Sequence, residues 1–355
     1  MILVPPRLAA LLFLAASVVT LHAGDPIRIL TIGSSFAENA TEFLPEIAKS
    51  RGVTITITKA NIGGSDLARH ARHLQAWLKN PADSEGRPYW DRADPEQKRY
   101  SLVERLQAGT WDYVTIQQFS GDSDKAETYE PYSEQLIAAV HKHAPAARVI
   151  VHQTWAYRFD HPIYFSSSPE KQSADERMRL ARSRDKVQRP EPLTPQAMYD
   201  GLRKAYDQLA ARYGLLMVPV GDAFQIASST PEWHYTPDPN FDYEHAARGT
   251  TPKQSGSLIG GWFWFTDRQT GAVSLALDAK HANIAGKYLG ACVFFESLTG
   301  QDARKLEWSP NGLAAAKAES LRRIAHDAVE RRKQSGTFDF AKSHPAAAAA
   351  ASATR

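Results

Sequence analysis

Short apolar runs alternate with amphipathic segments along most of this chain. Five runs have the length and composition of buried β-strands, at residues 27–32, 54–60, 113–118, 148–155 and 215–220. Segments with helical spacing lie between and after them, at residues 41–51, from Gly63-Gly64 to about residue 79, at 131–143, 196–213 and 284–298. Repeated strand–helix units form parallel sheets with helices on both faces. The pattern therefore predicts an α/β fold with about five parallel strands.

Two polar segments interrupt this alternation, at residues 158–191 and 228–266. The first is rich in Ser and Arg, and the second is rich in Pro, Gly and aromatic residues. Loops as long as these are usually functional or mobile in a compact domain. We therefore expect two surface insertions in a single domain over residues 24–335. A last helix should run from Ser309-Pro310 to about Arg332, and the alanine-rich tail at residues 336–355 should be disordered.

The N-terminus has the features of a signal peptide. Arg7 precedes an apolar run at residues 8–21, which is too short to span a bilayer comfortably, and the small residues Ala23 and Gly24 follow it. A membrane anchor and a buried N-terminal helix are the alternatives, but a strand pattern begins almost at once, at residue 27. We therefore expect removal of residues 1–23 and a secreted or periplasmic protein with no stable membrane anchor.

Charge and cysteine content argue against a nucleic-acid-binding protein and against a fold held by disulfides. The 42 Lys and Arg residues nearly balance the 39 Asp and Glu residues, and the basic residues are scattered along the chain, so no nucleic-acid surface is expected. Cys292 is the only cysteine, which excludes an internal disulfide. It lies in an apolar helical pattern, so we expect a buried small side chain rather than a nucleophile.

One serine and one Asp–His pair are the candidate catalytic residues. Ser35 follows the first strand, where its hydroxyl would lie above the carboxyl edge of the sheet. Asp278 stands three residues before His281, in an expected short loop ahead of an apolar helix that should end at Gly300. Such a carboxylate can orient an imidazole that takes the serine proton. Taken alone, each motif could also be an ordinary turn.

Together and in this order, the motifs resemble the SGNH (GDSL-like) hydrolase superfamily. Gly33-Ser34-Ser35-Phe36 looks like its first block, with Ser34 where the usual Asp stands. Asn61-Ile62-Gly63-Gly64 resembles the second block and Asp278-Ala279-Lys280-His281 the fifth. The resemblance implies a three-layer α/β/α, flavodoxin-like fold and a triad of Ser35, His281 and Asp278. It also implies that the backbone N–H groups of Ser35 and Gly64 line an oxyanion hole.

A closer likeness is to the DUF4886 branch of that superfamily. Its members show an Ile-Gly-x-Ser-Phe start and a Trp-Asp-Tyr-Val strand that ends in paired glutamines, as residues 32–36 and 111–118 do here. The segments 154–157, 286–289 and 298–300 fit as well. Each motif is weak alone, but five of them in order along one chain are specific.

One oxyanion donor of the superfamily is missing from this sequence. The third block normally supplies an Asn side chain, and no Asn stands at that place here. Since a Gln amide can donate the same hydrogen bond, we expect Gln117 or Gln118 to replace it. Successive strand residues point to opposite faces, so only one of the two should reach the site, and the sequence leaves open which.

Other side chains are candidates for the pocket. His70 follows Gly64 by six residues and would either line the pocket or lie on a helix surface. Trp155 and Tyr157 are candidate substrate contacts beyond the fourth strand. The second insertion adds aromatic residues that suit stacking on sugar rings and equally suit packing of loops: Trp233, His234, Tyr235, Trp262, Phe263 and Trp264. Because the histidines lack His-Glu-x-x-His or Cys-x-x-Cys spacing, we expect no metal.

These features predict an exported carboxylic ester hydrolase that needs no cofactor. Its substrate would be a small-molecule or glycan ester, with deacetylation of carbohydrate as one option. The alternative is a carbohydrate-binding protein with altered catalysis on the same fold. A dinucleotide-binding enzyme is disfavoured because no Gly-x-Gly-x-x-Gly follows the first strand. The sequence leaves open the acyl group, the alcohol and the oligomeric state.

Overall fold

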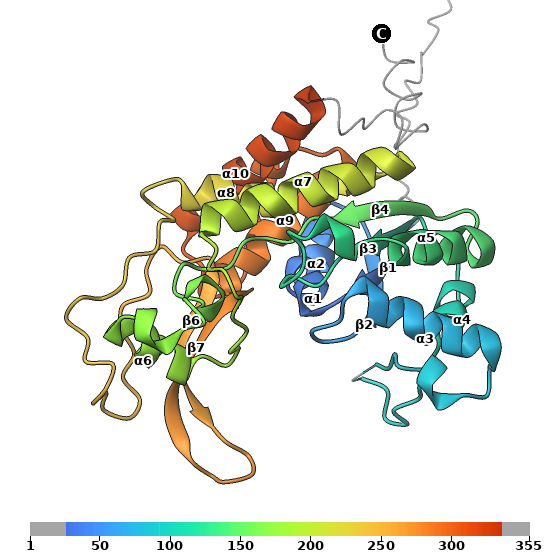
Figure 1. The fold of residues 1–355 in the computed structure, drawn as a ribbon. Coiled ribbons are helices and arrows are strands. Elements are labelled where there is room, and N and C mark those ends of the chain that lie inside the picture. Colours follow the sequence, from blue (N-terminus) through green and yellow to red (C-terminus); the bar gives the residue numbers. More distant parts are fainter. Residues whose placement is uncertain (1–25, 92, 336–355) are drawn as a thin grey trace, which may run out of the picture.

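A five-stranded parallel sheet forms the centre of the protein (Figure 1). The structure is a computed structural model that describes residues 26–91 and 93–335. The strands are β1 (Ile27–Gly33), β2 (Ile55–Asn61), β3 (Tyr113–Ile116), β4 (Arg148–His152) and β5 (Leu216–Val218). Their order across the sheet is β2-β1-β3-β4-β5, and each neighbouring pair is parallel. The predicted α/β fold is confirmed.

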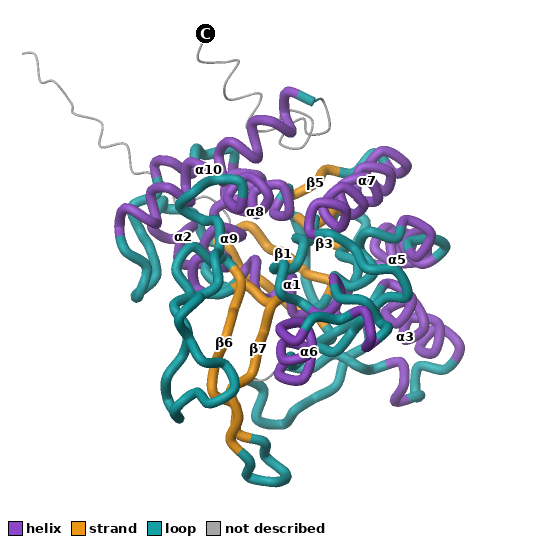
Figure 2. Tube along the Cα trace, turned by 60° about the vertical axis from the view of Figure 1, so that its left-hand side comes forward, coloured by secondary structure: helices purple, strands orange, loops and turns teal. Residues whose placement is uncertain are grey.

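Helices flank this sheet in two groups. One group contains α1 (Ser35–Thr41), α2 (Leu44–Ser50), α8 (Val220–Ser228), α9 (Ile284–Thr299) and α10 (Ala315–Gln334), which pack around α9. The second group contains α3 (Leu67–Lys79), α4 (Leu102–Gln107) and α5 (Tyr132–His143), while α7 (Pro195–Tyr213) packs beside β5. Figure 2 shows the sheet between the α9–α10 side and the α3–α5 side. Short 3-10 turns connect the elements: η1 (Ser84–Gly86), η2 (Ala126–Thr128), η3 (Pro162–Tyr164), η4 (Pro169–Lys171) and η5 (Ala303–Lys305).

The strands end earlier than the apolar runs predict. The runs that were expected to reach residues 118, 155 and 220 leave the sheet after Ile116, His152 and Val218. At β3 the cause is the loss of a partner strand. The N–H of Gln117 still donates to the Ile32 carbonyl at 3.1 Å, but the chain of β1 then turns into α1. Polar residues just past the strand ends can therefore bind loops at the carboxyl edge of the sheet.

The first helix begins at Ser35 and not at residue 41. Ser34 is its N-cap, with a side-chain oxygen that accepts a hydrogen bond from the Phe36 N–H. Within residues 41–51, the expected helix is α2, which starts only at Leu44. Asn39 lies inside α1 and binds a strand far away in sequence, since its Oδ1 accepts the Ala282 N–H at 3.0 Å.

The second insertion is partly regular structure. Its end forms β6 (Ile259–Thr266), which pairs antiparallel with β7 (Val273–Ala282) in a hairpin outside the central sheet (Figure 2). The segment from Asp278 to His281 was expected to be a short loop, and it is the end of β7 instead. Trp262, Leu275 and Leu277 are buried in a small apolar cluster on the hairpin, which stabilises the strand.

The first insertion contains α6 (Ala174–Arg182) and is anchored by a buried carboxylate. Asp160 is 1 % exposed, and it accepts hydrogen bonds from Arg158 Nε at 2.7 Å and Nη2 at 2.8 Å and from Arg179 Nη1 at 3.1 Å. Arg179 belongs to α6, so this carboxylate ties the helix of the insertion to the chain that leaves β4. A buried carboxylate with several charged donors is costly to unpair. The insertion is therefore a fixed part of the domain.

The C-terminal elements follow the predicted order. The helix α9 ends at Gly300, which has φ 68° as a left-handed cap requires. Cys292 is fully buried in α9, and burial raises the pKa of its thiol to about 12. The last helix starts at Ala315 rather than at Ser309-Pro310, because a turn at Gly312 with φ 87° precedes it.

Two predictions concern residues that the structure does not describe. The expected signal peptide at residues 1–23 and the expected tail at residues 336–355 both lie outside the described ranges. Within residues 26–91 and 93–335, none of the helices combines the length and the apolar character that crossing a membrane requires.

Candidate active site

Ser35 stands where β1 turns into α1, at the carboxyl edge of the sheet. The turn needs Gly33 just before it, because a Cβ there would lie 2.7 Å from the Oε1 atom of Gln117. Ser35 is the first residue of α1, so its N–H has no acceptor within the helix. The turn thus presents both the hydroxyl and the backbone N–H of the same serine.

The structure brings Ser35, His281 and Asp278 together. Ser35 Oγ lies 2.9 Å from His281 Nε2, and His281 Nδ1 lies 2.8 Å from Asp278 Oδ2. Asp278 Oδ1 also accepts the backbone N–H groups of Lys280 at 3.1 Å and His281 at 3.0 Å. Because a carboxylate faces Nδ1, that nitrogen carries the proton and Nε2 is left as an acceptor toward the serine.

The Asp278 carboxylate is stabilised in its ionised form. Partial burial raises its pKa, but the hydrogen bond and charge of His281 and the two backbone N–H donors outweigh burial and lower it to about 2. The Asp278 side chain is 26 % exposed and that of His281 is 31 % exposed, so both remain within reach of a ligand.

The end of β7 is held to the main domain by four hydrogen bonds from three segments of the chain. Trp155 Nε1 donates to the Lys280 carbonyl at 3.0 Å, and the Arg158 N–H donates to the Ala279 carbonyl at 2.9 Å. The other contacts are Asn39 Oδ1 with the Ala282 N–H at 3.0 Å and the Arg184 N–H with the Leu277 carbonyl at 2.9 Å. These bonds surround the Asp278–His281 segment and keep it above Ser35.

Trp155, predicted to contact substrate, is instead a fully buried packing residue. It is 0 % exposed and stacks on Phe36 with ring centroids 4.1 Å apart and on Phe224 at 4.5 Å. Tyr157 is 3 % exposed, and its hydroxyl lies 2.8 Å from Ser120 Oγ. Trp155 therefore links the nucleophile helix to β7 and has no surface left for a ligand.

Gly64 lies in the loop between β2 and α3 and adopts φ 64°, a conformation that favours glycine. It lines one cavity with Asp278 and His281. The N–H of Ile62, two residues earlier, donates to the Gly33 carbonyl at 2.9 Å and ties this loop to the nucleophile turn. The loop therefore lies beside Asp278 and His281, and its oxyanion role stays a prediction.

The structure does not present Gln117 as an oxyanion donor. Its side chain is buried beneath the nucleophile turn, where Oε1 accepts the Ser34 N–H at 3.1 Å. Its Nε2 donates to Ser34 Oγ at 3.2 Å and to the Gln118 carbonyl, so both amide hydrogens are used. Gln117 holds the backbone next to Ser35 and has no hydrogen left for a substrate.

Gln118 is also committed to other partners. Its Oε1 accepts the N–H groups of Leu67 and Phe119, each at 2.9 Å, and its Nε2 donates to the Thr128 carbonyl at 3.0 Å and hydroxyl at 2.9 Å. Leu67 is the first residue of α3, directly after the Gly64 loop. In this arrangement both amides are engaged within the protein, Gln117 with the backbone at Ser34 and Gln118 with the backbone at Leu67, so the oxyanion role of either glutamine stays a prediction.

His70 supports the same turn from below and does not line the pocket. It is 0 % exposed, its Nε2 donates to the Gly33 carbonyl at 3.1 Å, and its Nδ1 lies 2.8 Å from the Tyr89 hydroxyl. Burial lowers the pKa of His70 to about 3, although the hydrogen bond to Gly33 opposes this. The ring is thus neutral, and the Tyr89 hydroxyl donates to Nδ1.

A cavity of about 560 Å³ is lined by Asp278 and His281, though not by Ser35, and includes residues that sequence reasoning missed. Besides Gly64, Asp278 and His281, it is lined by Phe119, Arg184, Asp185, Val187, Phe263, Phe265, Ala279 and Lys280. Lys280 forms an ion pair with Asp185, and the Arg184 guanidinium lies 3.6 Å from the centre of the Phe265 ring. Phe263 was in the predicted aromatic set, but the contribution of residues 184–187 carried no sequence signal beyond the length of the first insertion.

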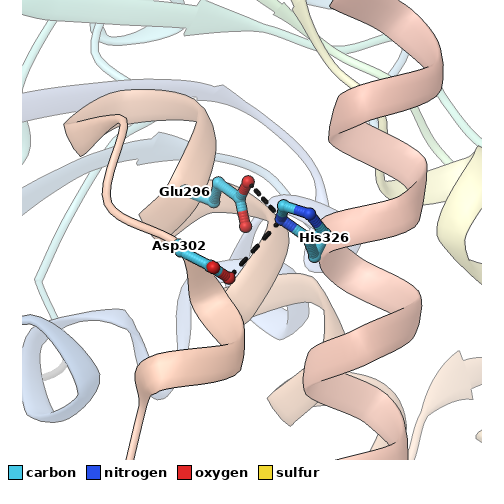
Figure 3. A group of neighbouring side chains, drawn as sticks. All are labelled: Glu296, Asp302 and His326. Carbon is cyan, nitrogen blue, oxygen red and sulfur yellow. Dashed lines mark hydrogen bonds and ion pairs between the residues drawn. The ribbon is translucent and has the colours of Figure 1, made fainter.

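One group of side chains outside the site has metal-ligand chemistry. Glu296 of α9, Asp302 and His326 of α10 lie together, and Figure 3 shows both carboxylates directed at His326. His326 Nδ1 is 2.9 Å from Glu296 Oε1 and 3.5 Å from Asp302 Oδ1, and Glu296 Oε2 accepts the Ala303 N–H. Hydrogen bonding between α9 and α10 accounts for this group, so we assign it a structural role.

Comparison with known proteins supports the family resemblance. The model of the DUF4886 family, a domain of unknown function, matches residues 28–173. That range contains Ser35, Gly64 and the paired glutamines, and it ends before Asp278 and His281. The predicted likeness to the DUF4886 branch is confirmed over this part of the chain. None of the curated proteins matches the sequence.

Solved structures show where the fold recurs. A DUF4886 family protein from Bacteroides uniformis ATCC 8492 is 22% identical, the alignment covers 86% of this chain and 95% of that one, and the TM-score is 0.58. A candidate SGNH hydrolase from Slackia heliotrinireducens is 18% identical, with 77% and 98% of the two chains covered and a TM-score of 0.37. A candidate GDSL-like lipase from Parabacteroides merdae ATCC 43184 is 12% identical, with 76% and 94% covered and a TM-score of 0.38. The first likeness shows a shared fold, and the scores of the other two are too low to add to it.

Proposed function

We propose that this protein is a serine hydrolase that cleaves carboxylic esters through Ser35, His281 and Asp278. The observation that carries the proposal is the continuous pair of hydrogen bonds from Ser35 Oγ through the imidazole of His281 to Asp278 Oδ2. A nucleophile, a base and a carboxylate that orients the base meet here, although Ser35 and His281 are 246 positions apart in sequence. This arrangement is the one that acyl transfer requires.

The geometry leads to a two-step mechanism. Ser35 Oγ attacks the acyl carbon while His281 Nε2 takes the hydroxyl proton, and the same nitrogen then gives that proton to the departing alcohol. Water next attacks the acyl-enzyme, His281 takes one of its protons, and that proton returns to Ser35 Oγ as the free acid leaves. Asp278 stays ionised throughout, since its pKa of about 2 lies far below neutral pH, and stabilises the imidazolium.

Backbone N–H groups supply the oxyanion hole in this mechanism. The N–H of Ser35 has no acceptor in α1, and Gly64 lines the cavity beside His281. Each such donor typically contributes about 3 kcal/mol to transition-state stabilisation. The glutamines act on the hole indirectly, because Gln117 binds the backbone at Ser34 and Gln118 binds the backbone at Leu67.

An acetylated carbohydrate is the substrate class we propose for this site. The cavity beside the triad presents the aromatic rings of Phe119, Phe263 and Phe265, which suit the apolar faces of sugar rings. Its volume of about 560 Å³ is within the range of small-ligand sites. Export to the periplasm or medium remains a prediction from the N-terminal sequence.

The alternative, a carbohydrate-binding protein that has lost catalysis, predicts an unreactive serine. An intact Ser35–His281–Asp278 hydrogen-bond chain argues against it, because a binding protein has no need to keep a base 2.9 Å from a hydroxyl. A fluorophosphonate probe distinguishes the two readings, since it captures only an activated serine.

The test uses two serine variants and one small ester. Ser35→Ala should abolish hydrolysis of p-nitrophenyl acetate and fluorophosphonate labelling and leave the thermal unfolding midpoint nearly unchanged. Ser50→Ala is the matched control, because Ser50 lies at the exposed end of α2 and its hydroxyl binds only the Ile47 carbonyl. Full turnover in Ser35→Ala, or a wild-type protein that the probe does not label, would show that Ser35 is not the nucleophile.

A further inference from the structure

A second cavity, of about 950 Å³, lies beside the base of the β6–β7 hairpin and is larger than the active-site cavity. Its walls come from the chain that leaves β4, the first turns of α7, the helix α8 and two parts of the second insertion. None of Ser35, Asp278 and His281 lines it. The largest well-formed pocket in a domain is the first place to look for a ligand site.

The two cavities are close neighbours. Ala279 lines the active-site cavity, and its carbonyl accepts the N–H of Arg158, which lines the second cavity. Behind this bond, Trp155 stacks between Phe36, next to the nucleophile, and Phe224, in the wall of the second cavity. The two cavities therefore share a wall, so a chain-like ligand held in one lies near the other.

The second cavity suits a neutral ligand. Apart from His234, Arg158 is the only acidic or basic side chain among the described residues that line it, and that guanidinium is paired with the buried carboxylate of Asp160. The Arg158 side chain is 4 % exposed, so its charge is already satisfied inside the protein. A charged ligand would find no opposite charge here and would lose its hydration without compensation.

The lining combines aromatic faces with neutral hydrogen-bonding groups. Five aromatic residues contribute to it: Tyr157, Phe159, Phe224, Trp233 and Tyr235. The polar side chains of Thr194, Gln196, Gln225, Ser228, Ser229 and Thr230 also face it. Sugar rings need both features, since their C–H faces stack on aromatic rings and their hydroxyls bind amides and hydroxyls. Each of these side chains already has a hydrogen-bond partner within the protein, and their remaining lone pairs and amide hydrogens can bind sugar hydroxyls.

Several of the rings are locked before any ligand arrives. Trp233 Nε1 donates to Ser320 Oγ at 3.2 Å, and the Arg158 guanidinium lies 3.9 Å from the centre of the Tyr235 ring. Phe159 stacks on Tyr235 with centroids 5.9 Å apart and keeps 42 % of its surface exposed. Rings that are already fixed lose little entropy on binding, which favours affinity.

We propose that this cavity is an accessory binding site for a neutral glycosyl unit. It would hold part of a glycan chain while an ester on a neighbouring unit enters the active-site cavity. The entry of an ester into the active-site cavity rests on the proposed hydrolase function, whereas glycan binding in the second cavity does not.

The experiment measures binding without turnover. Ser35→Ala protein is titrated with cellohexaose, xylohexaose and chitohexaose by calorimetry, and with oligogalacturonate and palmitate as charged and acyl-chain comparators. At least one neutral hexasaccharide should bind. Adding Phe159→Ala should weaken that binding by about fivefold or more through lost stacking. Adding Trp90→Ala should leave the binding unchanged, because Trp90 does not line the cavity. Trp90 is a matched control, since it is 40 % exposed and Phe159 is 42 % exposed.

Each remaining outcome overturns the proposal. The site is not a neutral-glycan site if none of the three hexasaccharides binds, if Phe159→Ala binds them as the parent does, or if oligogalacturonate or palmitate binds in their place. Hydrolysis of p-nitrophenyl acetate by the wild-type protein tests the proposed catalysis separately, so failure of one idea leaves the other standing.

Discussion

The side chain of Gln117 allows a direct test of how the nucleophile turn is held. Replacement by Glu keeps an oxygen that can accept the Ser34 N–H, now bound at 3.1 Å, and removes the amide hydrogens. Replacement by Met keeps the approximate volume and removes both functions. The two variants therefore separate an acceptor that positions the turn from a donor that binds the oxyanion.

The structure sets the size of each effect. In Gln117→Met the Ser34 N–H, in a residue that is 1 % exposed, loses its acceptor, which costs about 1–3 kcal/mol of folding free energy. A looser turn should also lower kcat by about tenfold or more, with a smaller change in KM. In Gln117→Glu a buried carboxyl group faces the Gln118 carbonyl, which lowers the folding free energy further, but the acceptor for the Ser34 N–H remains, so kcat per folded molecule should stay within about tenfold of the wild-type value. Loss of a true oxyanion donor would cost about 3 kcal/mol, or 10²–10³ in kcat.

The assay is steady-state hydrolysis of p-nitrophenyl acetate, with the free energy of unfolding measured in urea for each variant. The substitutions Gln118→Glu and Gln118→Met test how the loop at Gly64 is held, because Glu at position 118 keeps an acceptor for the Leu67 N–H. Gln75→Glu is the control, since Gln75 is exposed on α3 and donates to the half-buried Gln135. If Gln117→Glu or Gln118→Glu lost a hundredfold or more in kcat while remaining folded, the positioning role would be refuted and the donor role restored.

Two further predictions concern buried groups. His152 is fully buried, and burial lowers its pKa to about 3. As pH falls from about 6.5 toward 3, the unfolded chain therefore binds a proton at this histidine that the folded protein does not bind. The free energy of unfolding decreases in that pH window. His152→Leu should therefore reduce the loss of unfolding free energy between pH 8 and pH 5 by about 2 kcal/mol, measured in urea, and an unchanged loss would contradict this. Trp155→Phe keeps a stacking ring but removes the hydrogen bond to the Lys280 carbonyl. Its kcat should fall by about fivefold, for a bond of about 1 kcal/mol, at constant KM; a rise in KM alone would instead mean that Trp155 touches substrate.

The local features of the fold were readable from the chain. Strand–helix alternation depends on which residues are apolar along one segment, and such periodicity is visible without any knowledge of neighbours. It placed Ser35 at the end of the first strand, and the parallel sheet of the structure confirms that position. The spacing of Asp278 and His281 also reflects a local requirement, because a carboxylate three residues before an imidazole can reach both the ring and the backbone N–H of the same histidine.

What the sequence could not decide was the direction of side chains whose partners are distant in the chain. Gln117 and Gln118 are recognisable as polar residues at the edge of the sheet, but each amide is oriented by backbone groups that lie 83 and 51 positions away, at Ser34 and Leu67. The same holds for His70, which looks like a surface or pocket residue until α3 packs it beneath Gly33.

The strand character of Asp278–His281 was also a tertiary outcome. The segment forms a strand because β6 pairs with it and because Trp155 and Asn39 bind its far end. Hydrogen-bond partners and burial are properties of the folded neighbourhood, so they become fixed only when segments far apart in sequence meet. The sequence by itself determined which residues could react, and only the tertiary structure decided which of their polar neighbours position them.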